Sequence, residues 1–207
     1  MIERLMIKYG VNNPIFTNEI LEEMKEYSRP RVFQLIKKAE QEKLLIKFSK
    51  GVYYIPTKTR FGTSIISVEQ VVAKKYISNN DKVFGIYGGL QMKQNFMISY
   101  QIPTTIEVIT NNETTWVRKI RLRNRNVILR KSRCLISKDN VDAYTILELF
   151  TDLDMKKYKE DCSIKKEIVD FIKKKEIKSN DLFKLVSAFP SKTIKNIVDG
   201  GILGEFA

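Results

Sequence analysis

The spacing of apolar residues near the N-terminus predicts three short helices followed by a β-hairpin. Apolar positions recur three and four residues apart over 2–9, from Thr17 to 28, and from Pro30 to Ala39. Thr17 is a good N-cap, and Pro30 suits the first turn of a new helix. Two short β-rich runs follow at 45–48 and 52–55.

The residues between the two β-rich runs predict a tight turn. They are Ser49, Lys50 and Gly51, and Gly51 supplies the positive φ that such a turn requires. Pro56 ends the second strand because it has no N–H to donate. A lone hairpin is only marginally stable in water, so this one must pack on the helices. The order of elements is that of a winged helix-turn-helix, which we expect to occupy residues 1–58.

In a winged helix-turn-helix, the second helix of the pair enters the major groove and the hairpin contacts the DNA backbone. Arginine and glutamine side chains can bond guanine and adenine edges, and a lysine at the turn would reach a phosphate. The alternative is that these are solvated charges on an ordinary amphipathic helix. The candidate DNA-contact residues of this domain are Arg29, Arg31, Gln34, Lys37, Lys38 and Lys50.

The remainder of the chain predicts a second domain over residues 59–207, entered through a polar, basic linker at 57–62. Helical spacing follows Ser67 and Gly89, and then strands are predicted over 105–110, 116–122 and 127–130. Helical patterns dominate after Asp139, with a weaker second boundary near 155–162. The sequence therefore predicts an α+β protein: an N-terminal winged helix-turn-helix, then a mixed helix/antiparallel-strand domain with a helical C-terminal end.

The excess of positive charge indicates a polyanionic partner. The chain has 37 Lys and Arg against 24 Asp and Glu, a formal net charge of +13, which favours nucleic acid first and an acidic membrane second. A coding bias toward Lys, Asn and Ile could supply part of the excess.

The densest positive charge falls on the predicted strands between 118 and 133, where no acid interrupts the run. Alternation places Lys119, Arg121 and Arg123 on one sheet face, where they would suit nucleic-acid phosphates. The alternative is an exposed sheet face, or an edge protected by charge against aggregation. The candidate contact residues of this region are Arg118, Lys119, Arg121, Arg123 and Arg125.

Composition argues against most enzyme classes. Histidine is absent, which removes the commonest general base and most zinc enzymes, and no phosphate-binding G-x-x-x-x-G-K-[ST] motif occurs. The two cysteines, Cys134 and Cys162, are isolated, and the acids near Asp139 match no metal-ligand spacing. We expect no catalytic residues, no metal and no cofactor. No run of 18 apolar residues and no signal-peptide core occur, so we expect a cytoplasmic protein without membrane contact.

Several ordered landmarks give the chain a family resemblance. They are the winged-helix start, the phrase from Lys50 to Pro56, the helix running into Gly88-Gly89-Leu90, and Tyr100-Gln101-Ile102-Pro103 before the strand at 106–110. In this order they resemble the AbiEi-type antitoxins of bacterial type IV toxin–antitoxin systems, which also serve in abortive phage infection. The approach to Gln101, Phe96 to Tyr100, departs from the family's usual Leu-Gly-Leu-Ser-like phrase.

The resemblance implies two functions. The winged helix would repress the protein's own operon by binding inverted repeats in its promoter, with two copies of a monomer or weak dimer on each operator. The second domain would counteract a nucleotidyltransferase-like toxin without forming a stable complex with it. Other readings remain open: a winged-helix regulator whose second domain senses a ligand or dimerises, a toxin-sequestering module, and a nuclease or nucleotidyl-handling enzyme.

Overall fold

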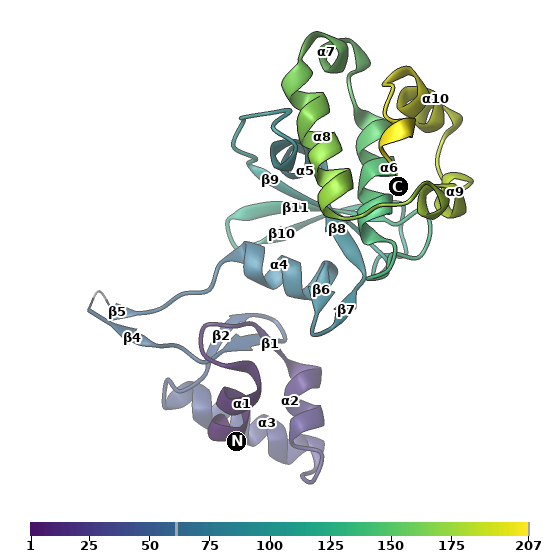
Figure 1. The fold of residues 1–207 in the computed structure, drawn as a ribbon. Helices are drawn as coiled ribbons and strands as arrows, with labels where there is room; N and C mark the ends of the chain where they lie inside the picture. The colour runs from purple at the N-terminus through teal and green to yellow at the C-terminus, as the bar shows by residue number, and fades with distance from the viewer. Residues whose placement is uncertain (61, 207) are drawn as a thin grey trace. The chain divides into compact units, whose positions relative to one another are not determined.

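The computed structural model describes residues 1–60 and 62–206 and divides the chain into two compact units (Figure 1). The first unit runs from Met1 to Lys74 and the second from Lys75 onward. Each unit has its own elements and core, and the two are described separately below.

The first unit begins with three helices and a small antiparallel sheet. Its N-terminal elements are α1 (Ile2–Tyr9), β1 (Ile15–Phe16), α2 (Thr17–Glu23), α3 (Arg29–Gln41), β2 (Ile46–Ser49) and β3 (Val52–Tyr54). The helices and the hairpin follow the order that the sequence predicts. Strand β1 was not predicted, and it pairs with β3 so that the sheet order is β1-β3-β2.

The core of the first unit consists of the apolar residues whose spacing predicts the helices. Leu5, Ile20, Val32 and Ile36 are all at most 2% exposed and belong to one cluster with Leu45. Each helix therefore turns its apolar face inward, which leaves its polar face to solvent.

Residues 57–62, expected to form a linker, begin a second hairpin. Strand β4 (Lys58–Thr59) pairs with β5 (Gly62–Thr63), and α4 (Val68–Tyr76) follows. The base of this hairpin is held because Ser64 N–H donates to the Thr57 carbonyl at 3.0 Å, and Asn12 Nδ2 donates to Thr57 Oγ1 at 2.9 Å.

Helix α4 contacts the N-terminal elements of the first unit through Lys74. Lys74 Nζ lies 2.9 Å from Glu19 Oε2 and donates to the Pro14 carbonyl at 2.6 Å. Because of these contacts the first unit extends to Lys74, and the expected boundary between residues 58 and 59 falls inside it.

The second unit contains a four-stranded sheet of order β10-β11-β9-β8. Its strands are β8 (Gly85–Tyr87), β9 (Thr105–Thr110), β10 (Val117–Leu122) and β11 (Arg125–Lys131). We expected antiparallel strands only, but β9 and β11 pair in parallel. The reason is that β10 takes the outer edge, and its short turn returns β11 between β10 and β9. Before the sheet, β6 (Ser78–Asn79) and β7 (Lys82–Val83) form a small hairpin, and α5 (Gly89–Asn95) follows β8.

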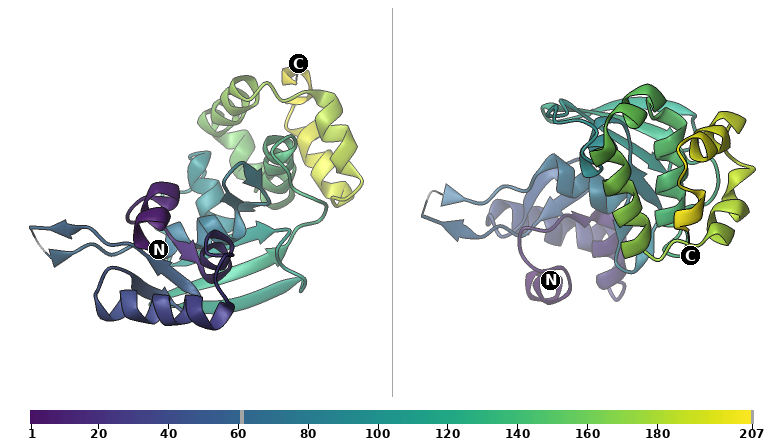
Figure 2. Two further views of the ribbon diagram at one scale, coloured as in Figure 1. Left: turned by 90° about the horizontal axis from the view of Figure 1, so that it is seen from below. Right: turned by 45° about the horizontal axis from the view of Figure 1, so that its top comes forward.

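The chain ends in helices, which gather on one side of this sheet (Figure 2). They are α6 (Val141–Asp152), α7 (Met155–Glu160), α8 (Cys162–Lys174), α9 (Ser179–Val186), α10 (Ser191–Asp199) and the 3₁₀ turn η1 (Leu203–Glu205). Residues 155–162, considered as a second boundary, form α7 and the start of α8, and Tyr158 is buried in the shared core.

Helix α6 is the central element of the second unit, because all of its residues from Ala143 to Thr151 except Thr145 are buried. Two polar contacts join it to α10: Thr151 Oγ1 lies 2.8 Å from Thr193 Oγ1, and Asn196 Nδ2 donates to the Phe150 carbonyl at 2.8 Å. The α+β class and the helical C-terminal end are therefore confirmed.

Candidate nucleic-acid interface

Helix α3 presents a basic face to solvent. Ser28 is its N-cap residue and Pro30 stands in the first turn, where a missing N–H costs nothing. Val32, Ile36 and Ala39 point into the core. All five α3 residues singled out from the sequence are exposed: Arg29, Arg31, Gln34, Lys37 and Lys38.

These residues do not all lie on one stripe of the helix. Arg31, Gln34 and Lys38 follow i, i+3, i+7 spacing and share a face, with Lys37 beside them, while Arg29 lies at the N-terminal end. Arg31 Nη1 donates to Gln34 Oε1 at 3.2 Å, so these two side chains meet. Lys38 Nζ lies 3.8 Å from Glu42 Oε1, a solvent-exposed pair of little energetic weight.

Three exposed side chains of the first unit were not predicted as contacts from the sequence. Phe33 is 46% exposed on α3, and an apolar contact of this kind suits the methyl group of thymine. Lys58 and Arg60 are exposed on the hairpin at 58–63, which was read as a linker. The signal for this hairpin was weak, because each of its strands has only two residues.

Lys50 lies in the turn between β2 and β3 and is exposed. Gly51 has φ +75°, as the turn prediction requires, and its carbonyl accepts the Thr17 N–H at 3.0 Å. The turn is thereby fixed against the first residue of α2, which positions the Lys50 backbone.

The cations of the second unit are divided between the surface and the interior. Lys119 and Arg121 on the edge strand β10 are exposed and share one face. Arg123 lies in the turn after β10 with φ +51°, so strand alternation no longer places it with them. Arg118 and Arg125 lie on the opposite face, by the same register.

Arg118 is held by an acid close to it in sequence. Its Nε and Nη2 each lie 2.7 Å from Glu113 Oε2. Glu113 is 4% exposed and also accepts bonds from the Thr115 N–H and hydroxyl. Burial by itself would raise the pKa of Glu113, but these bonds and the Arg118 charge outweigh it and lower that pKa to about 2.

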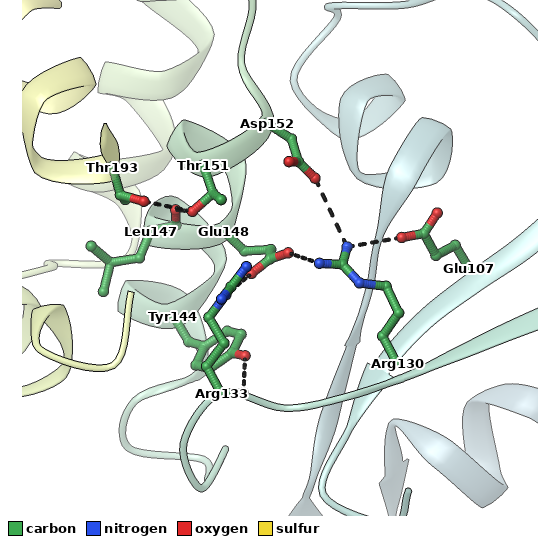
Figure 3. Close-up of polar contacts among 9 residues, drawn as sticks. All are labelled: Glu107, Arg130, Arg133, Tyr144, Leu147, Glu148, Thr151, Asp152 and Thr193. Carbon is green, nitrogen blue, oxygen red and sulfur yellow. Dashed lines mark hydrogen bonds and ion pairs between the residues drawn. The ribbon is translucent and has the colours of Figure 1, made fainter. Parts of the chain in front are cut away.

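Two further arginines of the basic run point inward onto α6 (Figure 3). Arg130 Nη1 lies 3.0 Å from Glu107 Oε1, and its Nη2 lies 3.0 Å from Glu148 Oε1. Arg133 Nε donates to Glu148 Oε2 at 3.3 Å, and Asp152 Oδ2 lies 3.8 Å from Arg130 Nη1. These cations are engaged by acids of the same unit and add little to an exposed basic surface.

The acid at the centre of this cluster is almost fully enclosed. Glu148 is 2% exposed, and burial raises its pKa above the ordinary value although both arginines act to lower it. Burial opposes the charge of Arg130, but Glu148 and Glu107 outweigh it and raise the Arg130 pKa. The cluster is therefore a structural tie between β11 and α6.

Gly88 and Gly89 make room for this tie. A Cβ on Gly89 would lie 2.6 Å from Glu107 Oε2, and Gly89 also has φ +54°. A side chain at Gly89 would displace the carboxylate that binds Arg130. These two glycines, which are among the landmarks of the family resemblance, serve close packing here.

The described residues, 1–60 and 62–206, contain no group of three His, Cys, Asp or Glu side chains placed to hold a metal ion. None of the helices within those ranges is long and apolar enough to cross a membrane. The arrangement offers exposed cations and aromatic rings, which are groups that bind nucleic acid.

Residues 14–180 match DUF6088, a family of unknown function, and the chain belongs to this family. The match spans parts of both units, from the residue before β1 into α9. No curated protein and no solved structure matches the chain.

Neutralising the central acid should destabilise the second unit. Replacing Glu148 by Gln keeps its shape but leaves Arg133 without a countercharge, so we expect the free energy of unfolding to fall by about 3 kcal/mol. Urea denaturation followed by circular dichroism measures this. Asp152→Asn is the matched control, since Asp152 is 53% exposed and should matter by less than about 1 kcal/mol. Equal losses in both variants would contradict the structural role of Glu148.

Glu113 should make stability depend on acid pH. Its pKa is about 2 in the folded chain against an ordinary 4.5, so its contribution is complete above pH 4.5 and is lost as pH falls toward 2. Thermal unfolding of the wild type and Glu113→Gln should differ at pH 6 and converge near pH 2. A difference between the two proteins that is the same at every pH would show that the Glu113 charge is not involved.

Proposed function

We propose that this protein is a DNA-binding antitoxin that represses its own operon and counteracts a nucleotidyltransferase-like toxin. In this proposal the first unit acts as a winged helix-turn-helix on inverted repeats in the promoter, with two copies on each operator. The second unit provides the antitoxic activity without a stable complex with the toxin. Both activities would take place in the cytoplasm.

The observation that carries the DNA-binding part is the exposed basic face of α3. This helix follows α2 after a short connection and precedes the hairpin β2–β3, which is the order in which a winged helix places its reading helix and its wing. Arg31 and Gln34 meet on the exposed face in the N-terminal half of α3, where their side chains can reach base edges. Lys50 at the hairpin turn supplies a phosphate contact.

The antitoxic part is supported by the resemblance to AbiEi-type antitoxins. The landmarks of that resemblance extend from the first unit into the sheet of the second, up to β9. The second unit should therefore be necessary for antitoxicity.

Fluorescence anisotropy with the duplex upstream of the gene and a scrambled duplex, in a salt series, tests the DNA-binding part. We expect tighter binding to the upstream duplex that persists near 150 mM salt. Arg31→Ala and Gln34→Ala should each lose about 5- to 100-fold in affinity for the upstream duplex and less for the scrambled one. Lys166→Ala on α8 removes a similar exposed charge outside the first unit and is the control. Equal binding to both duplexes, fading together with salt, would refute sequence reading.

Growth of cells that express the neighbouring toxin gene tests antitoxicity. We expect the whole chain to restore growth, and Arg31→Ala to restore it equally well from an independent promoter, because α3 serves repression. Failure of the whole chain to restore growth would refute the antitoxin assignment and leave a regulator of another kind.

A further inference from the structure

Trp116 is the only tryptophan of the chain and stands at the edge of the sheet in the second unit. It immediately precedes β10 and is 63% exposed. Two other apolar residues of this unit are also open: Val117, the next residue, is 49% exposed, and Leu135, in the loop after β11, is 74% exposed. An open indole offers a flat apolar face that can stack on a ligand, so this edge is a candidate interaction site.

The indole is held in place from within the unit. The backbone carbonyl of Trp116 accepts the Lys131 N–H at 3.2 Å, which extends the pairing of β10 with β11 by one residue. The Arg133 guanidinium lies 5.8 Å from the Trp116 ring centre and 5.5 Å from that of Phe189. Arg133 is fixed in turn by its bond to Glu148, so one side of the indole rests on an anchored group while most of its surface stays open.

Two exposed cations follow Trp116 along β10. Lys119 and Arg121 are exposed and lie about 10 Å and about 17 Å from Trp116, by the rise of an extended strand. Within the described part of the chain, no acid pairs with either of them, in contrast to Arg118, Arg130 and Arg133. Lys131 is exposed on the neighbouring strand, but strand alternation turns its side chain to the opposite face from Lys119 and Arg121.

We infer that this edge, formed by Trp116, Lys119 and Arg121, binds single-stranded nucleic acid. A base would stack on the indole, and the following phosphates would meet the cations along β10. Binding of this kind combines a basic track with an aromatic ring and tolerates many sequences.

A single strand fits this edge better than a duplex does. The bases of a duplex are already stacked on one another, and a duplex backbone offers phosphates to cations but no free base face to an indole. An acidic protein would likewise use the cations and leave the ring without a stacking partner. The proposed site uses only part of the basic run at 118–133. Arg118, Arg130 and Arg133 are engaged inside the unit and are not available to phosphates.

The single tryptophan makes the test specific, because its emission reports on this edge alone. The whole chain is titrated with a mixed-sequence single-stranded RNA of about 12 nucleotides, the DNA of the same sequence, the matching DNA duplex, and heparin as a polyanion without bases. We expect saturable quenching by the single strands, and little quenching by heparin or the duplex at concentrations where they bind. Absence of quenching by both single strands, or equal quenching by the duplex, would overturn the inference.

Variants separate stacking from charge. With a labelled single strand read by anisotropy, Trp116→Ala should bind about 5- to 100-fold more weakly, and Trp116→Phe should lose less. The double variant Lys119→Ala, Arg121→Ala should lower the salt dependence, reducing the slope of log affinity against log salt by about 1.4. Lys166→Ala is the charge control, and circular dichroism confirms that each variant is folded. Wild-type affinity in Trp116→Ala would overturn the inference. This test does not depend on operator binding by the first unit, so it can succeed or fail independently of the proposed function.

Discussion

The second unit depends on one enclosed ionic tie between its sheet and its central helix. Arg130 on β11 and Arg133 just after it converge on Glu148 of α6, an acid that is 2% exposed. A buried charge is tolerated only when it is paired, so the strand and the helix must keep this register. Glu107 on β9 completes the arrangement and ties a third element to it.

This tie also determines what the surface can do. A chain with a formal net charge of +13 has more cations than acids, and those spent on internal acids cannot face a ligand. The first unit shows the same division: Lys74 is enclosed against Glu19, whereas the cations of α3 are exposed. Function is therefore best sought where cations are exposed and not engaged with buried acids, on α3 and at Lys119 and Arg121 of β10.

Local patterns predicted most of the secondary structure, and contacts between distant residues account for the rest. The helices of the first unit and the strands at 105–110 and 117–122 follow from apolar period and caps. The parallel pairing of β9 with β11 could not be predicted, since it depends on which strand takes the sheet edge.

The candidate site, too, could be predicted from the sequence only in part. Exposure of Arg31 and Gln34 follows from helical period, because Val32 and Ile36 fix the buried side of α3. The internal use of Arg130 was hidden, because its partners Glu107 and Glu148 lie 23 and 18 residues away in sequence. The basic run at 118–133 therefore predicts a larger basic surface than the structure has.

The most direct test of the account is hydrogen–deuterium exchange of the whole chain, free and bound to the duplex upstream of its gene. The account predicts slower exchange over α3 and over the turn at Lys50 and Gly51, with a smaller effect from a scrambled duplex. Unchanged exchange over α3 with the upstream duplex bound, or equal slowing by both duplexes, would contradict the claim that α3 reads DNA.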